Sequence, residues 1–171
     1  FVGPKPEHIR TMGDKVEAKR TAVALGLPVV PGSPGAVTYG DECRKTAQDI
    51  GYPVLIKAAS GGGGRGMKVV PNADRLESLM SQASSEAAAA FGDPTVYMEK
   101  YLGNPRHIEF QVFGDGRGTA IHLGERDCSL QRRHQKVLEE APSPIISGDE
   151  RARMGKVCAD AMAAMHYRGA G

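Results

Sequence analysis

Hydrophobic and polar residues alternate most clearly over residues 106–113, RHIEFQVF. The apolar side chains of Ile108, Phe110 and Val112 fall on one face of an extended chain, as in a half-buried strand. The polar positions between and before them are His107, Glu109 and Gln111. The glycine-rich sequence GDGRG follows, and TAIHLGERD returns, so the pattern predicts an antiparallel β-hairpin.

Short apolar runs between breaker residues predict three further strands. They cover residues 53–58, 67–70 and 95–102, whereas residues 29–40 suit a loop or an edge strand. Helices are expected over residues 6–12, from Asp14 to Gly26, from Asp41 to Gly51, over residues 73–90 and from Asp149 onward. Asp14 is a suitable N-cap for the helix from Asp14 to Gly26, and Glu17 lies three residues later, as in a capping box.

The last predicted helix carries an apolar stripe at helical spacing. Its members are Met154, Val157, Cys158, Ala161, Met162 and Met165. Methionine fills irregular gaps between packed elements, so the stripe is interpreted as part of a core and not as a cofactor site.

Composition narrows the class of protein. The 171 residues carry a formal net charge of +2, which favours neither a nucleic-acid binder nor an acidic tail. The three cysteines are far apart in the sequence, which argues against a disulfide framework or a zinc site and favours a reducing compartment. We find no signal peptide and no apolar run of bilayer length. The missing initial methionine and the ending YRGAG suggest a piece of a larger protein.

Five glycines lie within residues 61–66, between two predicted strands. The spacing formally fits a dinucleotide fingerprint, but β-branched residues and Pro71 follow where a helix would be needed. A Walker A loop is excluded because no Gly-Lys-Ser/Thr closes the run. A hairpin flap whose amides fold over phosphate groups is favoured over a merely flexible tip.

Two lysines are placed where an anion would stabilise them. Lys57 ends an apolar strand, where an unpaired ammonium group is costly. Lys15 lies in the first turn of a helix, where the helix dipole disfavours a cation, so it is either directed at a ligand or solvated at the surface. His107 and Glu109 share one face of their predicted strand. That face is either solvated or binds a ligand.

Positive charge gathers in ERDCSLQRRHQK, residues 125–136. The basic members are Arg126, Arg132, Arg133, His134 and Lys136. No aromatic residue interleaves the run and acidic residues flank it, which argues against nucleic acid. A compact cluster of fixed donors suits phosphate, carboxylate or bicarbonate.

These stretches together resemble the biotin carboxylases, which are ATP-grasp enzymes. The resemblance rests on MGDKVEAK, GYPVLIKAASGGGGRGM, YMEKYL, NPRHIEFQV and ERDCSLQRRHQKVLEEAP, and it covers essentially the whole chain. It implies an α+β ATP-grasp fold. Residues 1–28 would end an N-terminal domain, residues 29–101 would form the lid over ATP, and residues 102–171 would begin the C-terminal domain.

The resemblance also implies roles for individual residues. Phosphate contacts fall on Lys15, Lys57, Gly63 and Gly64, and adenine contacts fall on Glu99, Lys100, Tyr101 and Leu102. His107, Gln131 and His134 belong to the rest of the nucleotide site, with His107 near the ribose. Lys136 resembles a bicarbonate-binding lysine, and Arg133 in the same run is taken as a second catalytic candidate.

The implied reaction is the ATP-dependent carboxylation of biotin by bicarbonate through carboxyphosphate, as in acetyl-CoA carboxylase and fatty acid biosynthesis. The expected partners are a biotin carboxyl carrier domain and a carboxyltransferase, in a cytoplasmic homodimer without nucleic acid or membrane. The Mg²⁺ ligands, a catalytic arginine and the base are expected beyond Gly171, so the 171-residue chain by itself is predicted not to turn over. The alternatives are another ATP-grasp carboxylate–amine ligase and a non-enzymatic module that binds anions or RNA.

Overall fold

The computed structural model describes residues 3–60 and 66–171, and the chain forms two compact units. The central unit comprises Gly13–Arg20 and Pro28–Gly103. The terminal unit comprises Phe1–Met12, Thr21–Leu27 and Asn104–Gly171. The division falls within helix α2 (Lys15–Ala24), whose residues up to Arg20 belong to the central unit. The three domains expected from the resemblance stay a prediction about a longer protein.

The central unit is built on a three-stranded antiparallel sheet of order β2-β1-β3. The strands are β1 (Val54–Ala58), β2 (Lys68–Val70) and β3 (Val96–Lys100). Helix α3 (Asp41–Ile50) precedes them, and a 3₁₀ turn (Ala73–Arg75) leads into helix α4 (Leu76–Phe91). Single bridges from Gly32 and Val37 to β3 confirm that residues 29–40 include an edge segment.

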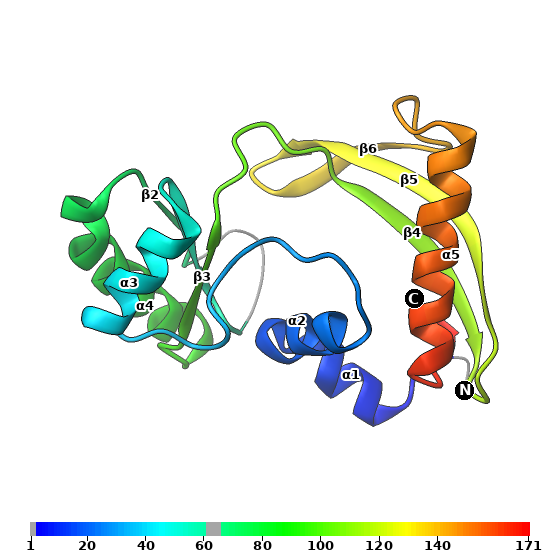
Figure 1. Cartoon of the computed structure of the whole chain (residues 1–171), viewed down its shortest axis with the longest axis horizontal. Coiled ribbons are helices and arrows are strands. Elements are labelled where there is room, and N and C mark those ends of the chain that lie inside the picture. Colours follow the sequence, from blue (N-terminus) through cyan, green and yellow to red (C-terminus); the bar gives the residue numbers. More distant parts are fainter. Residues whose placement is uncertain (1–2, 61–65) are drawn as a thin grey trace. The chain divides into compact units, whose positions relative to one another are not determined.

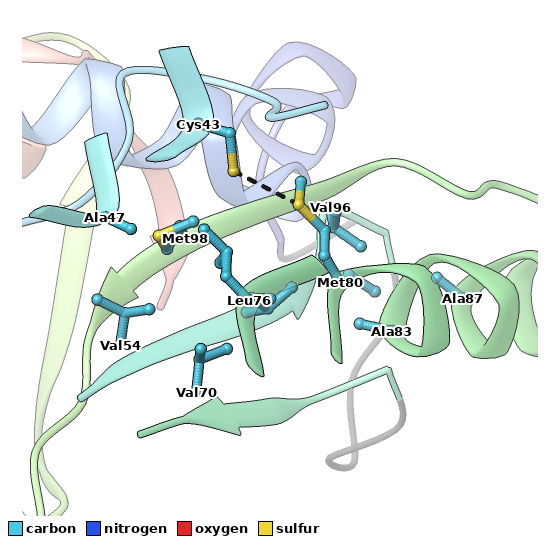
Figure 2. Packing of buried hydrophobic residues seen from close by; sticks show 12 residues of the cluster. Cys43, Ala47, Val54, Val70, Leu76, Met80, Ala83, Ala87, Val96 and Met98 are labelled. Atoms are coloured by element: carbon cyan, nitrogen blue, oxygen red, sulfur yellow. Dashed lines mark hydrogen bonds between the residues drawn. The ribbon is translucent and has the colours of Figure 1, made fainter. Parts of the chain in front are cut away.

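The core of the central unit lies between this sheet and helices α3 and α4 (Figure 2). Val54 and Ile56 alternate along β1 onto the same buried face, and neither is exposed to solvent. The α4 side chains that meet them are spaced three or four residues apart, as one helix face requires. These are Leu76, Met80, Ala83 and Ala87. The Cys43 thiol lies 3.5 Å from the Met80 sulfur.

The terminal unit holds a four-stranded antiparallel sheet of order β6-β5-β4-β7. Its strands are β4 (Ile108–Asp115), β5 (Ala120–Arg132), β6 (Gln135–Glu140) and β7 (Arg168–Ala170). The helices of this unit are α1 (Pro6–Gly13) and α5 (Gly148–Ala164), and α5 packs on β4 and β5 (Figure 1).

Helix α5 is fixed by local signals and by close packing. Ser147 and Glu150 form a capping box at its start. Gly155 faces the His122 ring so closely that a Cβ at this position would lie 2.3 Å from ring atoms. The predicted apolar stripe is correct only in its second half, because Met154 and Val157 remain 36% and 38% exposed.

Most predicted elements are confirmed. The hairpin of residues 106–127 forms as β4 and β5, although its register shifts between Phe110 and Val112. Phe110 and Val112 still share a face, because the Phe110 ring lies edge-on to His122, which pairs with Val112 and lies against Gly155 of α5. Asp14 accepts hydrogen bonds from the backbone amides of Val16 and Glu17, which confirms the cap of α2. Glu17 itself accepts from Arg20.

Two boundaries differ from the sequence-based prediction. Strand β3 ends at Lys100, so Tyr101 and Leu102 lie beyond it. Strand β5 continues to Arg132, so the basic run is part of a second hairpin with β6. Nowhere in residues 3–60 and 66–171 does a helix have the length and apolar character needed to cross a membrane.

Candidate functional site

A cluster of ammonium groups lies on the face of the central sheet opposite its core. Lys57 projects from β1 to this face because Val54, Ile56 and Ala58 occupy the buried one. Glu99 on β3 is paired with Leu55, two residues before Lys57, so its side chain lies diagonally beside that lysine. The Lys57 Nζ is 2.6 Å from Glu99 Oε2.

Helix α2 adds two more lysines to the same cluster. Lys19 Nζ lies 3.4 Å from Glu99 Oε1, and Lys15 Nζ donates to the carbonyl oxygen of Ala58 at 3.4 Å. The three lysines and one glutamate carry a formal charge of +2. The side chains of Lys57 and Glu99 are only 27% and 14% exposed, so this charge is poorly screened by water and favours a bound anion.

The pKa of Lys15 reflects this environment. Burial lowers it below its ordinary value, the neighbouring Lys57 charge lowers it further, and Glu99 acts in the opposite direction. An anion bound beside Lys15 would oppose both lowering effects. Burial, with the Glu99 charge, also raises the pKa of Tyr97, so this neighbour stays neutral.

Strand β1, which carries Lys57, ends at Ala58, before the glycine run of residues 61–66. Strands β1 and β2 pair antiparallel, with Val54 opposite Val70, which confirms the two strands of the predicted hairpin. Gly63 and Gly64 lie outside the described residues. Gly66, at φ +65°, packs against Ala58, where a Cβ would come within 3.2 Å.

The remaining residues expected at the adenine form a short segment at the end of β3. The Lys100 ammonium donates to the carbonyl oxygens of Gly51 and Tyr52. The amides of Lys100 and Tyr101 donate to Pro31 and Pro53, while the Leu102 side chain is half exposed. The Lys100 side chain therefore holds the chain before β1.

A second charged cluster lies in the terminal unit on the face of β4 that α5 does not cover. Glu109 Oε2 accepts from Lys136 Nζ at 2.5 Å, and Glu109 Oε1 accepts from Arg126 Nε at 2.7 Å. Arg126 also donates to Gln111, and Glu139 lies 3.3 Å from the Lys136 ammonium. The two cations and two carboxylates are formally neutral together, so an added anion must compete with carboxylates for Lys136.

The pKa values in this cluster show how firmly the charges are paired. The Lys136 hydrogen bond, followed by that of Arg126, lowers the pKa of Glu109 to about 2 despite partial burial. The Glu109 hydrogen bond raises the pKa of Lys136. Burial raises the pKa of the Cys128 thiol beneath them, and Lys136 opposes that rise.

The basic run is divided between two places. Arg126 and Lys136 lie in the cluster just described. Arg133 and His134 form the exposed two-residue turn of the β5/β6 hairpin, at φ 51° and 65°, with Arg132 paired to Gln135 on either side. The compact cluster of fixed donors that the spacing indicated is therefore not formed by the whole run.

His107 and Gln131 are brought together. The Gln131 amide donates to His107 Nδ1 at 2.7 Å and to the Cys128 carbonyl oxygen at 2.8 Å. His107 lies one residue before β4, and its carbonyl accepts from the Cys128 amide. These contacts fix the positions of two residues expected in the nucleotide site.

Sequence reasoning missed Lys19. It follows Lys15 by four residues on α2, so helical spacing alone places both on one side of the helix. The signal was present, but Glu99 as the shared partner could not be identified without the sheet.

Comparison with known proteins identifies the family. Residues 14–171 match the family described as carbamoyl-phosphate synthase L chain, ATP binding domain, and the chain belongs to this family. A biotin carboxylase of Allochromatium vinosum is 56% identical over the entire chain. A pyruvate carboxylase subunit of Methanothermobacter thermautotrophicus is 52% identical over the same span. The chain spans 38% and 35% of the lengths of these two relatives.

Solved structures agree with the fold. A biotin carboxylase–β-γ-ATP complex from Campylobacter jejuni has a TM-score of 0.93 at 52% identity, over 99% of this chain and 38% of that one. The biotin carboxylase domain dimer of Hydrogenobacter thermophilus 2-oxoglutarate carboxylase, with MgADP, ADP and bicarbonate, has a TM-score of 0.94 at 45% identity, with the same coverage. The expected α+β ATP-grasp fold and the resemblance to biotin carboxylases are confirmed.

Proposed function

We propose that this chain is the nucleotide-binding part of a biotin carboxylase, an ADP-forming ligase that carboxylates biotin with bicarbonate. The observation that carries the proposal is the cluster of Lys15, Lys19 and Lys57 around Glu99. Its excess positive charge lies at the strand from which the glycine hairpin leaves. A triphosphate has the charge and the oxygen acceptors that these ammonium groups require.

The proposed nucleotide site extends from this cluster. Lys15 and Lys57 hold phosphate oxygens and the glycine hairpin, with Gly63 and Gly64, covers them. The segment Glu99–Leu102 holds the adenine, where the main-chain groups not already bonded within the unit would recognise the ring edge. His107, Gln131 and His134 complete the site, with His107 near the ribose.

In the proposed reaction a bicarbonate oxygen attacks the γ-phosphorus of ATP, and the bond to ADP breaks. The resulting carboxyphosphate breaks down to CO₂ and inorganic phosphate. The ureido nitrogen of biotin forms a bond to the CO₂ carbon, and the released phosphate takes up the proton of that nitrogen. Lys136 is proposed to bind the bicarbonate. The bicarbonate must then compete with the Glu109 and Glu139 carboxylates for the Lys136 ammonium group. Arg133, on the exposed turn, is a second proposed contact for the anionic substrate.

Mg²⁺ would bridge and neutralise phosphate oxygens in this reaction. One group in the described part of the chain, Glu109, Cys128 and Glu139, has ligand atoms within 4.8 Å of one another. It does not suit Mg²⁺, because Arg126 and Lys136 already pair with both carboxylates and a thiol is a poor ligand for this ion. The magnesium ligands are therefore proposed to lie beyond Gly171, and the 171-residue chain alone is predicted to be inactive.

The proposed setting of the natural protein is a cytoplasmic biotin-dependent carboxylase. Its partners would be a biotin carboxyl carrier domain and a carboxyltransferase, in a homodimeric assembly. Similarity to biotin carboxylases and to a subunit of a pyruvate carboxylase supports a biotin-dependent carboxylase.

A titration with MgATP tests the proposal. We expect amide signals next to Lys57, and of Gly66, to shift on adding MgATP in NMR spectra of the protein at its natural length. Lys57→Gln should weaken MgATP binding by about tenfold or more. Lys45→Gln is the matched control, because Lys45 is an exposed lysine of the same unit paired with Asp49. Affinity for RNA that falls steeply with salt, without any response to MgATP, would instead support the RNA-binding alternative.

A further inference from the structure

Lys19 has no role in the nucleotide site as the resemblance defines it, yet it is among the most enclosed lysines of the central unit. Its side chain is 17% exposed, and its ammonium group lies 3.4 Å from Glu99 Oε1. Enclosing a lysine at such a position costs hydration and rotamer freedom, so a favourable interaction must offset that cost. The ion pair with Glu99 is that interaction.

The backbone makes room for this ammonium group at Gly32. A Cβ at residue 32 would lie 2.5 Å from Lys19 Nζ and 2.5 Å from the Met98 carbonyl oxygen. Gly32 forms a β-bridge with Glu99, so the lysine approaches the carboxylate across the edge of the sheet. A larger residue at position 32 would displace the lysine or the edge segment.

Glu99 therefore divides its two oxygens between two cations. Oε1 faces Lys19 and Oε2 faces Lys57. With one oxygen held from α2, the carboxylate cannot turn both oxygens to Lys57. The Lys57 ammonium has three donors, so engaging one with Glu99 leaves others to meet phosphate oxygens.

We propose that Lys19 is a positioning residue for triphosphate binding, which holds Glu99 so that Lys57 is aimed at the phosphates and only partly neutralised. This inference rests on the proposed function. Lys19 acts through Glu99 and does not touch the nucleotide. Without Lys19, both carboxylate oxygens can turn to Lys57 and engage more of its donors.

The experiment is a double-mutant cycle on the protein at its natural length. Calorimetry at fixed salt gives the Kd for MgATP and for inorganic tripolyphosphate in the wild type, Lys19→Met, Glu99→Gln and the double variant. We expect Lys19→Met to weaken both ligands by about tenfold. In the Glu99→Gln background, the same change should alter Kd by less than about twofold, because the carboxylate through which Lys19 acts is gone.

Three controls separate the possible outcomes. Lys45→Met removes an exposed lysine of the same unit and should change Kd by less than about twofold. Lys19→Gln keeps a hydrogen-bond donor for Glu99. It replaces Lys19→Met if the Tm of Lys19→Met is well below that of the wild type. Lys57→Gln reports on the proposed function itself.

Two results would overturn the inference. An unchanged Kd in Lys19→Met, with Lys57→Gln strongly impaired, removes the role of Lys19 and leaves the proposed function intact. An equal loss with and without Glu99 means that Lys19 acts on the phosphates independently of this carboxylate, so it is not a positioning residue. If Lys57→Gln also leaves the Kd unchanged, the proposed function fails, and this inference fails with it.

Discussion

Replacing Glu109 by glutamine should destabilise the terminal unit at neutral pH and remove part of its acid sensitivity. The carboxylate accepts from Lys136 and from Arg126, and these hydrogen bonds hold its pKa near 2. Glutamine has nearly the same shape but offers one uncharged acceptor oxygen, so the variant tests the charge with little change in packing.

The size of the stability loss follows from the pKa of Glu109. Folding lowers this pKa from 4.5 to about 2, and each pKa unit corresponds to ~1.36 kcal/mol, so the charged side chain stabilises the fold by at most about 3 kcal/mol. The side chain is 26% exposed, and Arg126 and Lys136 are each 36% exposed, so water screens much of this energy. We expect Glu109→Gln to lower the free energy of unfolding by about 1 to 2 kcal/mol at pH 7.

The pH window also follows from the pKa. Because folding lowers the pKa of Glu109, its stabilising effect is present above about pH 4.5 and is lost as pH falls towards 2. The difference between wild type and variant should therefore shrink over that interval, while other carboxyl groups titrate equally in both. Urea titrations followed by hydrogen exchange of β4 and β5 amides report on this unit specifically.

The matched control is Asp160→Asn, which removes an acidic charge from α5 of the same unit. Asp160 is 62% exposed and pairs with Lys156 at the surface, so its loss should cost under about 0.5 kcal/mol. A difference between Glu109→Gln and wild type that is the same at pH 7 and at pH 2.5 would refute the electrostatic reasoning. A cost no larger than that of the control would refute it as well.

Three further variants test the packing that positions the sites. Met98→Ala removes a fully buried side chain of the central core and should cost about 2 to 4 kcal/mol in urea unfolding of that unit; a loss below about 1 kcal/mol would contradict the assigned core. Arg151→Met strands the Glu125 carboxylate, whose side chain has no exposure, and should cost about 3 kcal/mol, largely recovered by adding Glu125→Gln; no recovery would argue against the ion pair. Gly155→Ala brings a methyl group into the His122 ring and should lower the Tm of the terminal unit by several degrees or more, at least about 5 °C; an unchanged Tm would show that α5 docks less closely.

Local sequence patterns predicted the elements well where the signals are short-range. Alternation over residues 106–113 and the turn after it specified the β4/β5 hairpin, because pairing of adjacent strands needs only a short loop. Asp14 marked the start of α2, because its carboxylate accepts from the Val16 and Glu17 amides. Gly51 marked the end of α3 through its φ of 80° and its amide bond to the Ala47 carbonyl oxygen. The β5/β6 hairpin was not predicted, because local patterns reveal a turn only through its residue types. Arg133 and His134 form this turn at positive φ, where asparagine and glycine are the usual residues.

Burial was harder to predict, because a stripe on a helix does not say how much of it is covered. Met154 and Val157 share spacing with Ala161, yet only Ala161 is buried. Gly155 and Arg151 determine which part of α5 contacts β5. Gly155 packs against His122, and Arg151 forms an ion pair with Glu125. Neither residue belongs to the apolar pattern.

The sequence alone determined which residue types could hold an anion and where the chain must turn. Lys15, Lys57 and the glycine run carry that chemistry wherever they lie, and glycine spacing with flanking strands excluded a helix-based phosphate loop. Only the tertiary structure decided which charges cancel and which remain. Strand pairing places Glu99 between Lys57 and Lys19, leaving an excess of positive charge, whereas Glu109 and Glu139 neutralise Lys136 and Arg126. Ion pairing depends on distances between residues far apart in sequence, and those distances are set by sheet register and helix docking.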